Sequence, residues 1–141
     1  MKFPIYVISV LATGAILSGC GAGGGSIPQD GGPPRVVLTS VPQLGSFAHL
    51  KGQVYNVKAN TCKIACWIYV ANSWWPKPYY AQLWTPIRAD GSFETDVTTG
   101  GIDEQATELR AYLETNDYSD GLSLPPDPPT AQVLAMASAH R

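Results

Sequence analysis

The chain has 141 residues, of which 45% are hydrophobic and 14% are charged, and its formal net charge is −2 at pH 7. This weak charge excludes the strongly basic surface expected of a nucleic-acid-binding protein, so no nucleic-acid partner is predicted. Once an N-terminal signal is set aside, the length suits one domain with tails.

The first segment ends in Leu17-Ser18-Gly19-Cys20, which has the pattern of a bacterial lipobox. Lys2 precedes an apolar run, Ile5 to Leu17, that is too short to span a bilayer comfortably. We predict a signal peptide over residues 1–19, helical in its apolar part, and lipidation of Cys20 with palmitate-type acyl chains, since several chains make anchoring stable. An ordinary secretory signal with a chance cysteine is the alternative.

This anchor predicts a bacterial envelope protein held at the membrane by lipid and facing the periplasm or the cell surface. Gly21 stands where an aspartate retains some lipoproteins at the inner membrane, so the outer membrane is preferred if the host is Gram-negative. Residues 20–34 are rich in glycine and proline and predict a flexible tether, because such a segment buries too little apolar surface to offset its entropy.

Residues 35–124 are predicted to form the folded domain, and strand signals dominate them. Alternating or β-branched runs favour six strands: Arg35–Val41, Leu50–Val57, Lys63–Ala71, Thr85–Arg88, Ser92–Val97 and Glu108–Thr115. Ala89-Asp90-Gly91 predicts a tight turn that pairs the fourth strand with the fifth, and Asp103–Thr107 predicts one helical turn.

This strand spacing predicts an all-β fold, specifically a small antiparallel β-sandwich of immunoglobulin-like type. Its core is expected to contain the apolar residues on one face of each strand: Val54, Ile64, Cys66, Ile68, Val70, Phe93, Leu109 and Leu113. Residues 125–141 are predicted as a Pro-rich segment, Pro125–Pro129, and a short C-terminal tail. Ala131–His140 has a helix-favouring composition but is too short to be stable alone, so it packs on the domain or frays.

Charge is divided unevenly along the chain. Arg35 to Arg88 contains six basic and no acidic residues, whereas Asp90 to Asp127 contains ten acidic residues and one basic residue. Because both halves contribute strands, this division favours charge pairing across strands. An acidic face for cations is the alternative.

Seven of the fourteen aromatic residues lie between Trp67 and Trp84. Trp67 and Tyr69 share the strand face opposite the aliphatic residues, and the run from Trp74 to Pro78 is expected in a loop. Rigid exposed rings stack on sugars or anchor protein interfaces. The pattern favours a second hydrophobic layer, in which the rings cover the edge of the sandwich, over either of these two interpretations. The candidate ligand-binding residues are Trp74, Trp75, Lys77, Tyr79 and Tyr80.

Several short motifs are shared with one kind of bacterial module: Gly52-Gln53-Val54, Ile64-Ala65-Cys66-Trp67-Ile68, Trp74-Trp75-Pro76-Lys77-Pro78, Asp90-Gly91-Ser92-Phe93, Thr98-Thr99-Gly100-Gly101-Ile102-Asp103 and Ala106 to Leu113. With these motifs, Val41 to Leu124 resembles a small β-sandwich module of secreted proteins that occurs alone or beside carbohydrate-active domains. The resemblance implies no catalytic residue. Asn60-Thr61-Cys62 and Cys66 depart from its pattern.

Cys62 and Cys66 form a candidate disulfide, since the expected compartment is oxidising. Four residues of extended strand span about 13 Å, however, whereas bridged Cα atoms lie within about 7 Å, so the bond requires Cys62 to fold back. Cys66 as a small buried apolar residue is the alternative.

No motif for a nucleophile, a phosphate loop or a zinc site is present, so we predict no enzyme activity, no catalytic residues, no metal and no cofactor. Asn116, Asp117 and Asp120 offer oxygens for calcium, but a side-chain-stabilised turn explains them better. The sequence therefore predicts a noncatalytic lipid-anchored protein, with carbohydrate as ligand. The alternative is a structural or protein-docking lipoprotein whose aromatic residues are buried in its core or against an envelope protein.

Overall fold

The computed structural model describes residues 25–117 and 132–141. The predicted signal peptide, Cys20 and Pro125–Pro129 lie outside the described residues. The strands are β1 (Arg35–Ser40), β2 (Leu50–Tyr55), β3 (Cys62–Val70), β4 (Ser73–Lys77), β5 (Trp84–Thr85), β6 (Ser92–Thr95), β7 (Glu108–Thr115) and β8 (Val133–His140), with a 3-10 helix, η1 (Asp103–Gln105). Within the described ranges, no helix has the length and apolar character needed to cross a bilayer.

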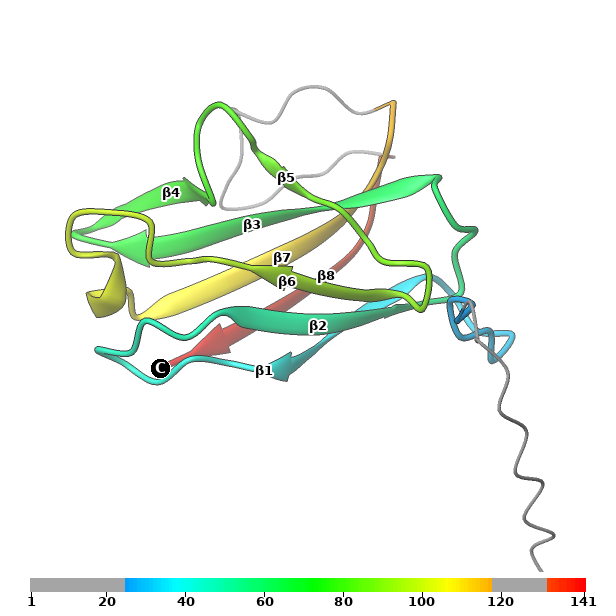
Figure 1. Ribbon diagram of the computed structural model, residues 1–141, viewed down its shortest axis with the longest axis horizontal. Helices are drawn as coiled ribbons and strands as arrows, with labels where there is room; N and C mark the ends of the chain where they lie inside the picture. The colour runs from blue at the N-terminus through cyan, green and yellow to red at the C-terminus, as the bar shows by residue number, and fades with distance from the viewer. Residues whose placement is uncertain (1–24, 118–131) are drawn as a thin grey trace, which may run out of the picture.

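The strands form two antiparallel sheets that face each other (Figure 1). Sheet A has three strands in the order β1-β2-β6. Sheet B has five strands in the order β4-β3-β7-β8, with β5 also paired to β3. The predicted all-β class is confirmed, and two packed sheets fit a β-sandwich.

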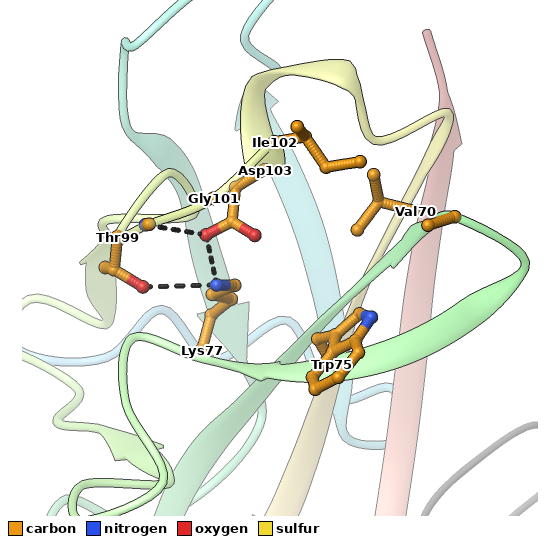
Figure 2. Close-up of a pocket in the computed structure, with 9 residues that line it drawn as sticks. Val70, Trp75, Lys77, Thr99, Gly101, Ile102 and Asp103 are labelled. Atoms are coloured by element: carbon orange, nitrogen blue, oxygen red, sulfur yellow. Dashed lines mark hydrogen bonds and ion pairs between the residues drawn. The ribbon is translucent and has the colours of Figure 1, made fainter.

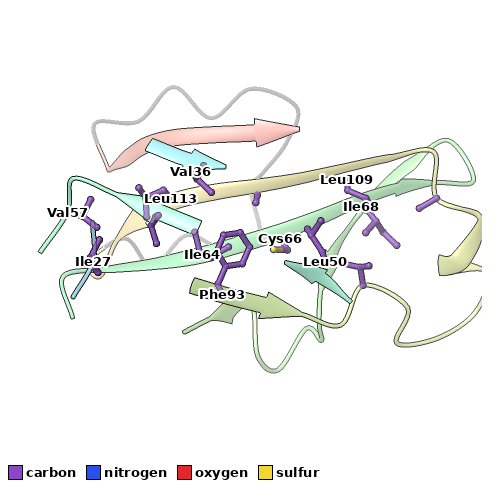
Figure 3. Close-up of a cluster of buried hydrophobic side chains, with 14 of the residues drawn as sticks. Ile27, Val36, Leu50, Val57, Ile64, Cys66, Ile68, Phe93, Leu109 and Leu113 are labelled. Atoms are coloured by element: carbon purple, nitrogen blue, oxygen red, sulfur yellow. The ribbon is translucent and has the colours of Figure 1, made fainter. Parts of the chain in front are cut away.

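The core lies between the sheets and contains all eight predicted core residues (Figure 3). Phe93 of sheet A lies directly over Gly52, where an added Cβ would come within 2.2 Å of the Phe93 ring and 2.7 Å of the Val37 carbonyl oxygen. Only glycine therefore permits this close approach within sheet A.

The predicted strand pairing around the Asp90 turn is wrong, although the turn itself is confirmed. Gly91 has φ of 85°, and the backbone N–H of Ser92 donates to Asp90 Oδ1 at 2.9 Å. However, β5 pairs with β3, and β6 pairs with β2. The chain crosses from one sheet to the other in this segment, so the two strands belong to different sheets.

The expected Trp74–Pro78 loop is also wrong, because Trp74 and Trp75 belong to β4, which forms a hairpin with β3. Ala71 and Asn72 connect the two strands, with φ of 51° and 60°. Two consecutive positive φ values define the type I′ turn that matches the twist of a tight hairpin.

The helix-favouring C-terminal run packs on the domain, which is one of the two expected outcomes, but it does so as a strand: Val133–His140 forms β8 and pairs with β7. Alanine, leucine and methionine favour helices in isolation, but the backbone hydrogen bonds offered by β7 decide the conformation here. The folded unit thus includes the C-terminal residues, and β8 lies beside β1 of the other sheet (Figure 1).

The flexible tether predicted for residues 20–34 is wrong from Ile27 onward. Ile27 is buried in the main core, and the backbone N–H of Asn56 donates to the Pro28 carbonyl at 3.0 Å. Gln29 Nε2 donates to the Val57 carbonyl at 2.9 Å. Asp30 accepts hydrogen bonds from Asn56 and the Gly32 backbone and pairs with Arg35, and these contacts lower the pKa of Asp30 to about 2.

Charge pairing between strands is confirmed. Glu94 of β6 lies 3.3 Å from Lys51 Nζ of the neighbouring β2, 3.2 Å from Arg88 Nη2 and 3.0 Å from His49 Nδ1. Hydrogen bonds from Arg88, Lys51 and His49 lower the pKa of Glu94. The basic first half and the acidic second half of the chain thus meet within the sheets.

Candidate functional site

The alternation of β4 separates the two adjacent tryptophans onto opposite faces of sheet B. Trp75 is opposite Ile68 and Lys77 is opposite Cys66, so both share the face that carries the core. Trp74 is opposite Tyr69 on the outer face. The structure therefore does not place Trp74 and Trp75 in one flat platform.

Trp74 belongs to a second apolar layer on the outside of sheet B. It is half-buried and packs against a cluster of Ala65, Trp67 and Tyr112. Its ring lies 5.2 Å from that of Tyr69, and the Arg110 guanidinium sits over it at 4.3 Å. Trp74 is thus held by packing and by a cation–π contact.

Trp75, by contrast, is 41% exposed and lines a pocket of about 310 Å³. The pocket lies between the end of the β3–β4 hairpin and the loop that leads into η1 (Figure 2). Its lining residues are Val70, Ala71, Trp75, Lys77, Thr99, Gly100, Gly101, Ile102 and Asp103. Its size is at the lower end of the range for small-molecule sites.

One side of the pocket is apolar and the other is polar. Figure 2 shows Trp75, Val70 and Ile102 apart from the polar group made by Lys77, Thr99 and Asp103. A flat ring beside a compact polar group offers a ligand one apolar surface and one hydrogen-bonding surface.

The polar group is built around a buried ion pair between Lys77 and Asp103, each only 7% exposed. Lys77 Nζ also donates to Thr99 Oγ1 at 3.1 Å, and that hydroxyl donates to the Pro78 carbonyl at 2.6 Å. The backbone N–H of Gly100 donates to Asp103 Oδ2 at 3.0 Å. This network holds both charged side chains in place.

The other two predicted residues lie outside the pocket lining. Tyr79 and Tyr80 follow β4 and are 54% and 61% exposed. The Tyr80 ring meets Trp75 edge-on, with ring centroids 6.4 Å apart and an interplanar angle of 86°. Tyr80 therefore supports Trp75 from the side instead of extending a flat surface.

The candidate disulfide is absent, and both cysteines are free. They lie four residues apart in the same continuous strand, β3, so neither folds back toward the other. Cys66 is fully buried, and burial raises the pKa of its thiol to about 12. Cys66 is therefore a small, unreactive core residue, which was the alternative to a disulfide in the sequence analysis.

Glu114 is a second unusual buried group, remote from the pocket lining. Its Oε2 accepts a hydrogen bond from Trp84 Nε1 at 3.2 Å, while Oε1 is buried without a hydrogen-bond partner. Burial raises its pKa to about 7, and the Trp84 hydrogen bond and the positive charge of Lys63 oppose the rise. Lys63 itself lies 3.8 Å from the Trp84 ring centroid.

Sequence reasoning identified Trp75 and Lys77 but missed the other half of the pocket. Thr99, Gly100, Ile102 and Asp103 belong to the Thr-Thr-Gly-Gly-x-Asp motif, for which no role was predicted. The uneven charge distribution could have indicated this partner. Because residues 35–88 contain no aspartate or glutamate, an acidic partner for Lys77 has to come from the second half of the chain. The predicted turn at Asp103 is confirmed as η1.

Within residues 25–117 and 132–141, no group of three or more histidine, cysteine, aspartate or glutamate side chains is placed to hold a metal ion. No family model, no curated protein and no solved structure matches this chain. The resemblance to a secreted β-sandwich module therefore stays a prediction.

Proposed function

We propose that this protein is a noncatalytic, lipid-anchored envelope protein that binds carbohydrate in the pocket beside Trp75. The observation that carries the proposal is the combination of an exposed tryptophan ring with a preorganised polar group, Lys77–Asp103, in one pocket. A sugar ring has the matching chemistry, with C–H groups on one face and hydroxyls at its rim. Stacking on Trp75 supplies affinity, and the polar group supplies orientation.

The position of the pocket suits an anchored binding domain. The first described residues lie at one end of the molecule, and η1 beside the pocket lies at the other (Figure 1). The chain between Cys20 and the buried Ile27 reaches about 25 Å at most. A lipid on Cys20 would therefore hold the domain close to the membrane with its pocket turned outward, at the outer membrane if the host is Gram-negative.

The immunoglobulin-like form of the sandwich is part of the same proposal. Two antiparallel sheets around one core support it. A shallow site desolvates little of a ligand, so affinities of about 10–1000 μM are expected.

A protein-docking role is the second candidate. It is favoured by the exposure of Trp75, Tyr79 and Tyr80 next to one another on the chain, since aromatic residues often anchor protein interfaces. On this alternative, Trp74 contributes only to the outer packing layer.

A glycan array and a pull-down from envelope membranes, run in parallel, test the proposal. The proteins are wild type, Trp75→Ala and the control Met136→Ala, which removes an exposed apolar side chain from β8. We expect wild type and Met136→Ala to bind glycans and Trp75→Ala to lose binding. A partner protein captured through Trp75, with no glycan bound, would overturn the carbohydrate proposal in favour of docking.

A further inference from the structure

From the charge balance of the pocket, we infer that its ligand is a neutral sugar and that acidic sugars are rejected. This inference rests on the proposed carbohydrate function and specifies the class of ligand. It depends on the Lys77–Asp103 pair and on what surrounds it.

Lys77 and Asp103 are the charged residues among those that line the pocket, and they neutralise each other. Two further residues of opposite charge, Arg141 and Glu104, lie next to Asp103. Arg141 donates to the Asp103 backbone carbonyl at 2.9 Å, and Glu104 and Asp103 both attract its guanidinium. Lys77, Asp103, Arg141 and Glu104 together carry two positive and two negative charges at and next to Asp103.

This balance leaves no positive charge for an anionic ligand. A uronate placed against Trp75 would have to lose part of its hydration and approach the Asp103 carboxylate, with Lys77 already paired. Like charges brought to close range across an interface weaken binding.

The hydroxyl groups of a neutral sugar, in contrast, can form hydrogen bonds with Asp103 and Lys77. Both described hydrogen bonds to the Asp103 carboxylate end at Oδ2, and Figure 2 shows its other oxygen turned toward the side where Val70 and Ile102 lie. Lys77 Nζ has three N–H groups, of which two are directed at Asp103 and Thr99. One acceptor and one donor side by side match two neighbouring hydroxyls of a pyranose.

The test uses pairs of methyl glycosides that differ only at C6: glucoside and glucuronide, galactoside and galacturonide, mannoside and mannuronide. Binding to wild-type protein is measured by ligand-observed NMR at low and high salt. We expect the neutral member to bind at least about tenfold more tightly in every pair that binds, with little effect of salt on its affinity. An acidic member that binds as tightly as its neutral partner overturns this inference alone, whereas a complete lack of glycoside binding overturns the proposed function as well.

Asp103→Asn provides a second test, because it leaves the Lys77 charge unpaired. We expect the preference within each pair to shift toward the acidic member by about tenfold, while Trp75→Ala weakens both members equally. An unchanged preference in folded Asp103→Asn would contradict the inference. If that variant does not fold, the comparison of neutral and acidic members with wild-type protein still decides.

Discussion

Lys77 of β4 and Asp103 of η1 form a buried ion pair on the polar side of the pocket that Trp75 lines. The pair joins the β3–β4 hairpin to the loop beyond β6 and so brings together two motifs that are 26 residues apart in the chain. Trp75 belongs to β4, the edge strand of sheet B. The polar side of the pocket is held in place by the Lys77–Asp103 ion pair.

The two neighbouring tryptophans should respond differently to substitution. Trp74→Ala removes a half-buried ring from the outer layer and is expected to reduce the free energy of unfolding by about 2–3 kcal/mol, below the full cost for a core tryptophan. Trp75→Ala removes an exposed ring and should change the free energy of unfolding by less than about 1 kcal/mol, while it abolishes glycan binding. Urea denaturation and the glycan array measure the two effects. Equal destabilisation by both would show that Trp75 is also a packing residue.

Glu114 should make stability fall as pH rises. Its pKa is raised from 4.5 to about 7 in the folded protein, so the folded state binds more protons than the unfolded state between these values. The destabilisation is absent below the unfolded pKa of 4.5 and complete above the folded pKa of about 7. At its largest it amounts to about 3 kcal/mol.

Glu114→Gln removes this charge and should flatten the decline. The free energy of unfolding is measured for both proteins at about pH 5 and pH 8, and the difference between them isolates Glu114 from the other carboxyl groups. The same decline in wild type and variant would show that Glu114 does not titrate in this range.

Much of the fold follows from local pattern. Strand β7 has the predicted bounds, and the alternation of β3 places Ile64, Cys66 and Ile68 in the core as expected. The failures involve information that lies elsewhere in the chain. Strand β8 needs β7 as a partner, and the β3–β4 turn places Ala71 at positive φ, where alanine gives no sequence signal. The pocket is formed by both the β3–β4 hairpin and the loop near Asp103, and the sequence predicted only the residues of the hairpin.

The docked N-terminal segment gives a third prediction. Ile27→Ala should reduce the free energy of unfolding by about 2 kcal/mol or more, because Ile27 belongs to the core, whereas the exposed neighbour Ser26→Ala should have no effect. Hydrogen exchange at the Asn56 amide, which donates to Pro28, should accelerate in Ile27→Ala. Equal free energies of unfolding for the two variants would show that Ile27 does not pack in the core and that this segment is a flexible tether, as the sequence predicted.

The cysteines give a fourth prediction. In a Cys20→Ser variant under native conditions, one thiol, that of the half-buried Cys62, should react rapidly with a thiol reagent. Cys66 should react only after unfolding, since it is buried and its pKa is raised to about 12. Mass spectrometry identifies the labelled residue. A native protein with neither thiol available would indicate that the two are oxidised.

Chemical-shift mapping of isotopically labelled protein with neutral glycosides tests the carbohydrate pocket most directly. Ligand in the pocket should shift the indole N–H of Trp75 and the backbone amides of Gly100 and Gly101, and should leave the indole of Trp84, which is hydrogen-bonded to Glu114, unchanged. Shifts confined to other surfaces, or no shifts with any neutral glycoside, would contradict carbohydrate binding at Trp75.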